Sequence, residues 1–131
     1  MSENLDRVKG YLLDLDLKIV SENEAEELLV VDDEDNGIKH LVIDCEPPIV
    51  ILEQLIAETP AEPGDLFKRL LQMNNTLVHG AFVLDETGER IFYRDTLQLA
   101  NLDLNELEGS IRALSLALGE YGAELLEHLG K

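Results

Sequence analysis

Apolar residues recur at helical spacing in three segments, and each segment predicts an amphipathic helix. The first spans residues 5–15, with Ser2 or Asn4 as its N-cap. The second spans residues 66–73 and should end at the two asparagines that follow. The third has the most regular pattern, with alternating spacings of three and four in Leu104, Leu107, Ile111, Leu114, Leu118, Tyr121 and Leu125.

The third segment also carries start signals and unusual glycines. Asn105 with Glu108 has the spacing of a capping box, and Asp103 is the rival N-cap. Glycine weakens a helix interior by about 1 kcal/mol relative to alanine. We therefore expect close packing against a neighbour to compensate at Gly109, Gly119 and Gly122.

Between the helical segments, runs of β-forming residues predict five strands. They are residues 28–31, 41–43, 49–56, 81–84 and 90–93. Residues 17–20 are either one more short strand or the entry to a strand. Asn36-Gly37 predicts a hairpin, because both residues accept a positive φ. The order of helix, three strands, helix, two strands and helix predicts one α+β domain over residues 1–131, with a five-stranded, mainly antiparallel sheet.

The predicted strands lack the alternation of apolar and polar residues that an antiparallel sheet shows when one of its faces meets water. Residues 28–31, 41–43, 49–52 and 91–93 are apolar at successive positions. Both faces of the sheet therefore need a cover, and three helices are few for that task. Either the helices divide between the two faces, or a second subunit or a client protein covers one of them.

The charge of the chain restricts its partners. Asp and Glu total 28 against 10 Lys and Arg, a formal net charge of −18. Such a surface repels nucleic acids and anionic membranes, so we expect neither as a partner. A basic partner fits better, although simple solubility explains the charge equally well. With one cysteine, no signal-peptide pattern and no long apolar run, we expect a cytoplasmic protein.

No set of residues is arranged for catalysis, for a metal ion or for a cofactor. Cys45 and His40 are five positions apart in one predicted strand, so they face opposite sides and form no nucleophile–base pair. The acidic stretch from Asp32 matches a calcium loop in part, but its twelfth residue is Ile43 where a glutamate is needed. We expect no enzyme, no metal and no cofactor.

Three stretches of the sequence resemble a known family. They read LFKRLLQMNN from residue 66, HGAFVLDETGERIFYRDTLQL from residue 79 and LDLNELEGSIRALSLALGEYGAELL from residue 102. The chain resembles the YbjN-type bacterial branch of the type III secretion chaperone-like superfamily. The resemblance covers the order of elements over the whole chain and a textual pattern from Leu66 to Leu126. It implies homodimers that hold partly unfolded clients through apolar patches and strand addition, or, in the YbjN-type branch, stress-linked or regulatory roles.

These observations lead to one predicted function and two alternatives. We predict a chaperone-like module that binds a polypeptide partner as a homodimer. Leu66, Leu70 and Met73 are the candidates for self-association, and Ile49 and Ile51 for the partner. A regulatory or sensory domain would instead need a ligand-sized pocket with convergent polar groups. An enzyme would need clustered acids or histidines with shifted pKa values in one cleft.

Overall fold

The computed structural model describes residues 3–129 as an antiparallel sheet with helices packed on it. The helices are α1 (Glu3–Asp14), α2 (Leu66–Asn74) and α3 (Leu104–Leu129). The strands are β1 (Lys18–Asn23), β2 (Leu28–Asp33), β3 (Ile38–Glu46), β4 (Ile49–Glu58), β5 (Ala81–Leu84) and β6 (Arg90–Gln98), and a short 3-10 helix, η1 (Glu34–Asn36), joins β2 to β3.

The sheet has six strands in the order β1-β2-β3-β4-β6-β5, one more than the five predicted. Every neighbouring pair is antiparallel. The additional strand is β1. Residues 17–20, which could have been a short strand or only the entry to one, thus contribute to a strand of their own. Within β1 only Ile19 packs against the core and the other residues are exposed. The sequence of this edge strand therefore lacks the apolar run that would have predicted it.

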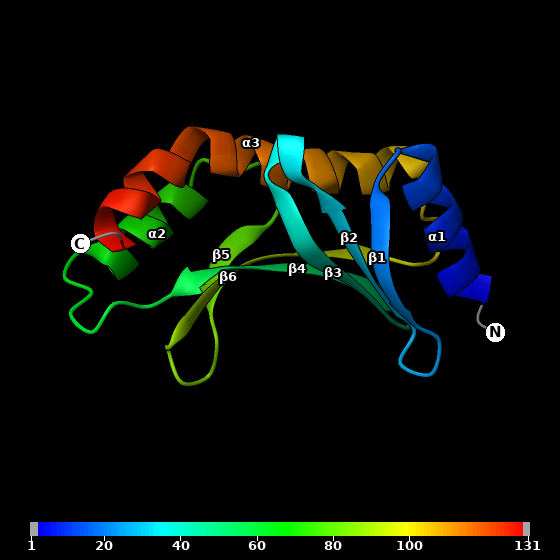
Figure 1. The fold of residues 1–131 in the computed structure, drawn as a ribbon, viewed down its shortest axis with the longest axis horizontal. Coiled ribbons are helices and arrows are strands. Elements are labelled where there is room, and N and C mark those ends of the chain that lie inside the picture. The colour runs from blue at the N-terminus through cyan, green and yellow to red at the C-terminus, as the bar shows by residue number, and fades with distance from the viewer. Residues whose placement is uncertain (1–2, 130–131) are drawn as a thin grey trace.

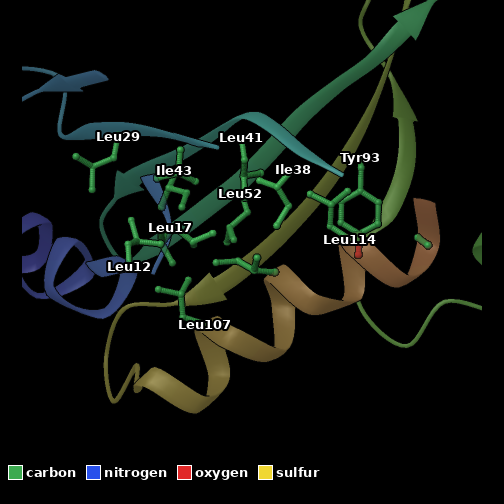
Figure 2. Packing of buried hydrophobic residues seen from close by; sticks show 14 of the residues in the cluster. Leu12, Leu17, Leu29, Ile38, Leu41, Ile43, Leu52, Tyr93, Leu107 and Leu114 are labelled. Carbon is green, nitrogen blue, oxygen red and sulfur yellow. The ribbon is translucent and has the colours of Figure 1, made fainter. Parts of the chain in front are cut away.

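All three helices lie on one side of the sheet (Figure 1). Their buried residues and one side of each of the strands β2–β6 form a single hydrophobic cluster. Figure 2 shows side chains of α1 and α3, among them Leu12, Leu107 and Leu114, gathered with strand residues such as Leu52. The helices therefore do not divide between the two faces of the sheet.

The start of α3 and its glycines differ in part from expectation. Asp103 is the N-cap, since its Oδ1 accepts the backbone N–H of Glu106 at 2.7 Å. Asn105 lies inside the helix. The expectation of close packing at Gly109, Gly119 and Gly122 is wrong, because a Cβ at any of them would meet nothing within 4 Å. In α1, Asn4 is also internal, and Ser2 lies outside the described residues.

The predicted hairpin around Asn36-Gly37 is confirmed in a longer form than a two-residue turn. β2 and β3 pair on either side of η1, and Gly37 has a φ of 80° at its C-cap. Ser115 of α3 donates a hydrogen bond to the carbonyl of Asn36 at 2.7 Å. The tip of this hairpin is thereby held to α3.

Candidate protein-binding face

The side of the sheet that points away from the helices carries an apolar surface, which we call the open face. Its side chains alternate with those of the core along each strand, and none of them belongs to the hydrophobic cluster. The main residues of the open face are Leu28, Val30, Val42, Asp44, Ile49, Ile51, Glu53, Leu55, Val83, Phe92, Arg94 and Thr96. Most of them are half-buried, because neighbouring strands shield one another's side chains.

The strand register places these residues in rows across the sheet. One row runs Leu28, Asp44, Ile51 and Thr96. The next runs Val30, Val42, Glu53 and Arg94. A third joins Leu55, Phe92 and Val83 beyond the charged pair. Side chains directly opposite one another in a sheet are in contact, as Val30 is with Val42 and Leu55 with Phe92. The rows together form a largely apolar surface that no helix of the described chain covers.

Ile49 and Ile51, predicted as partner contacts, both lie on the open face. Sequence reasoning did not single out Leu55, Phe92 and Val83 on the same face. Leu55 is 50% exposed. The missing alternation at residues 91–93 pointed to this region, but which residues pointed outward depended on the register, and a bulge at residue 56 shifts that register within β4.

The predicted self-association residues need a correction. Leu66, Leu70 and Met73 are 0%, 4% and 0% exposed, and they pack into the chain's own core. A second subunit cannot reach them while the fold is intact. Their spacing marks the buried stripe of α2, and the exposed side of the same helix presents Leu71, which is 71% exposed.

Charged groups interrupt the open face at two places with different environments. Glu53 accepts a hydrogen bond from Arg94 at 3.5 Å, so this carboxylate has a cation beside it. Asp44 has none: its Oδ1 is shielded from solvent and receives no hydrogen bond. Burial raises the pKa of Asp44 most, repulsion by Glu46 and a hydrogen bond between the two carboxyl groups raise it further, and repulsion by Glu26 and Glu27 adds to the effect. The folded chain therefore holds Asp44 in a place that disfavours its charge.

Asp44→Asn should consequently stabilise the protein at neutral pH, by up to about 1 kcal/mol. A carboxyl whose folded-state pKa is raised contributes stability at low pH, and that contribution is lost as the pH rises through the raised pKa. The stability advantage of the variant should thus be small near pH 3.8, the ordinary pKa of Asp, and should grow toward neutrality. Urea unfolding of both proteins at several pH values measures this difference. A difference that is constant with pH would contradict the assignment.

The residues considered for chemistry are not brought together. Cys45 is buried in the core, whereas His40 is exposed. Burial raises the pKa of the Cys45 thiol to about 11, and Glu27 and Asp44 add to the effect, so the reactive thiolate is disfavoured. In the described part of the chain, no three His, Cys, Asp or Glu side chains lie where they could hold a metal ion.

The described surface has two hollows large enough for a small ligand. One, of about 340 Å³, lies between η1 and α3. Its polar groups are already paired, since Arg112 binds Glu108 and Ser115 binds the Asn36 carbonyl. The other, of about 370 Å³, lies beside His40, Leu55 and Leu118. The first hollow therefore has few polar groups free to orient a small ligand, as a regulatory pocket would need. In the second, Gln54 is bonded to backbone groups of Lys39 and Gly37.

A comparison with known families shows to which family the chain belongs. The sequence profile of one family, CesT_Tir_1, matches residues 1–130. The chain belongs to the CesT_Tir_1 family. Among curated proteins, none is similar enough to count as a match.

Solved structures share the fold of this CesT_Tir_1 member. YbjN from E. coli, described as a putative transcription regulator, superposes with a TM-score of 0.70 at 16% identity, over 92% of this chain and 93% of that one. The HopA1-SchA chaperone-effector complex gives a TM-score of 0.64 at 15% identity, over 88% and 93%. The ExsC-ExsE complex gives 0.62 at 15% identity, over 89% and 92%. The resemblance to the YbjN-type and secretion-chaperone fold is confirmed.

Among residues 3–129, no helix has the length and apolar character needed to cross a membrane.

Proposed function

We propose that this CesT_Tir_1 member is a non-catalytic, chaperone-like module that binds a polypeptide on its open face. One observation carries the proposal: the sheet exposes a largely apolar surface on the side that the helices leave bare. Large apolar patches on folded proteins mark contact surfaces, because exposing them to water costs free energy that a partner recovers. The unpaired, buried Cys45 fits a reducing compartment, which we propose to be the cytoplasm.

The fold relatives support a polypeptide as the occupant. The HopA1-SchA complex is described as a chaperone with its effector. The type III secretion chaperone SycH of Yersinia pestis was solved with a fragment of YscM2, and its chain has a TM-score of 0.59 and 14% identity to this one, over 88% of this chain and 98% of that one. The hollow between η1 and α3 does not favour the small-molecule alternative, because Arg112 in it binds Glu108 and Ser115 binds the Asn36 carbonyl.

The protein acts as a homodimer in this proposal, with the contact moved to the exposed side of the helical layer. Leu71 of α2 and Leu126 of α3 are 71% and 68% exposed. Arg69 and Glu124 join these two helices through two hydrogen bonds, so both leucines stand on a rigid surface. Pairing through this layer leaves the open face free for the partner.

Binding is tested by substituting Ile51. Affinity purification from the source cells should recover a partner with the wild-type protein and lose it with Ile51→Glu, because a buried, unpaired charge is costly at an interface. Leu116→Glu is the matched control, since Leu116 is a 74% exposed leucine on α3, away from the open face. Ile51→Thr keeps the β-branched shape that suits a strand, and serves as a second variant if the glutamate disturbs folding. Equal recovery by all proteins would refute the open face as the binding surface.

Light scattering tests the dimer independently. The wild-type protein should have twice the monomer mass, and Leu71→Glu should be monomeric. A strictly monomeric wild type at high concentration would rule out self-association and leave partner binding on the open face unaffected.

A further inference from the structure

We propose that the polypeptide on the open face is basic and amphipathic, and that one of its Lys or Arg side chains pairs with Asp44. The inference rests on the proposed function, because it specifies the chemistry of the segment that covers the same face. Three observations carry it: the position of Asp44, the charges around it, and the apolar row at the other end of the face.

Asp44 has an apolar side chain beside it on each of its two neighbouring strands. It faces Leu28 on one neighbouring strand and Ile51 on the other. Its Oδ1 is shielded from solvent, and no donor of the described chain reaches it. Covering the face with a purely apolar partner would bury this carboxylate completely without a counter-charge, at a large cost in free energy.

Among the described residues, no cation acts on Asp44 to offset that cost. The charged groups that act on it are Glu46 on the same strand and Glu26 and Glu27 in the turn between β1 and β2, all of them acidic. Arg94, which also lies on the open face, is engaged with Glu53. A counter-charge for Asp44 must therefore come from the partner.

A second copy of this chain is a poor source of that charge. On the open face of a second copy, Arg94 is paired with Glu53 and the groups around Asp44 are acidic, so that face offers no free cation. A basic segment is favoured in two ways. Its cation pairs with Asp44, and its net positive charge is attracted by the acidic molecule as a whole. Electrostatic complementarity thus favours a basic partner over self-association on this face.

The distance between Asp44 and the apolar residues Leu55 and Phe92 predicts how basic and apolar residues are spaced in the bound segment. Asp44 is opposite Ile51, and Leu55, which faces Phe92, is four residues farther along β4. Four strand residues span about 14 Å. An extended segment lying along β4 would place a basic residue over Asp44 and, four positions away on the same side, a large apolar residue over Leu55 and Phe92.

A random peptide library displayed on phage tests the inference on the full chain. Peptides of about 12 residues are long enough to span the distance. Peptides selected on the wild-type protein should carry Lys or Arg four positions from a large apolar residue. Synthesised afterwards, they should bind Asp44→Asn about tenfold more weakly, as expected for the loss of a charge-assisted hydrogen bond. They should not bind Ile51→Glu.

Asp14→Asn is the matched control, because it removes the same charge from the exposed end of α1. It should change the affinity by less than about twofold. Peptides that need Ile51 but show no basic enrichment, or that bind Asp44→Asn and wild type equally, would overturn the inference and leave the proposed function standing. Peptides indifferent to Ile51→Glu would overturn both. An open face occupied by a second copy, seen as a dimer that Ile51→Glu dissociates, would overturn both the inference and the proposed function.

Discussion

Gly80→Ala is expected to destabilise the fold by about 3 kcal/mol or more, from backbone strain and a steric overlap together. Gly80 has a φ of 72°, a region that residues with a Cβ rarely adopt. A Cβ at this position would also overlap the hydroxyl and ring of Tyr93. Tyr93 cannot move aside easily. Its side chain is buried, its hydroxyl donates to the His79 carbonyl at 2.6 Å, and its ring packs edge-on against Phe82.

Urea unfolding of Gly80→Ala measures this loss, and Gly119→Ala provides the matched control. Gly119 lies within α3 with open space around it, so the same substitution should stabilise the protein by about 0.4–1 kcal/mol. Opposite signs for the two variants are the expected result. If Gly80→Ala unfolds at the wild-type urea concentration, the close approach of Gly80 and Tyr93 is refuted.

Leu114→Ala should cost about 2–5 kcal/mol, because it leaves a cavity between α3 and the sheet. The side chain of Leu114 is 1% exposed and belongs to the central cluster (Figure 2). A packed interior relaxes only in part around a deleted side chain, so both the transfer free energy and the packing contacts are lost. Thermal or urea unfolding gives the magnitude.

Leu116→Ala is the control for this variant, because the same atoms are removed two residues farther along the same helix. Leu116 is 74% exposed, so its replacement should change the free energy of unfolding by less than about 0.5 kcal/mol. Similar losses in the two variants would mean that the face of α3 assigned to the core is wrong.

The helices were predictable from sequence because their apolar spacing repeats over several turns. Residues 66–73 and 104–125 anticipated α2 and α3 within a few positions. Strand β1 was not resolved, because an edge strand with one apolar residue on the core carries no periodic signal. The sequence did not decide the N-cap of α3, because Asp103 and Asn105 are both suitable capping residues. The path of the chain into the helix selects Asp103.

The sequence predicted that part of the sheet surface would be apolar and uncovered, but it identified only some of the residues on that face. Ile49 and Ile51 lie on it, whereas Leu66, Leu70 and Met73 are core residues of α2. An apolar stripe at helical spacing is the same in sequence whether it faces a sheet or a second subunit. Its exposed neighbour Leu71 became distinguishable only when the packing of α2 was known.

The sequence by itself determined the class of fold, the strong negative charge and the excess of apolar strand surface, since these follow from composition and local periodicity. It left open whether the helices would share the two faces of the sheet or crowd onto one. That depended on where the connecting segments place the helices, and it is a property of long-range packing that no local pattern encodes. Only the tertiary structure therefore decided that one apolar face stays bare. Only the strand register decided that Asp44 stands within it, between Leu28 and Ile51.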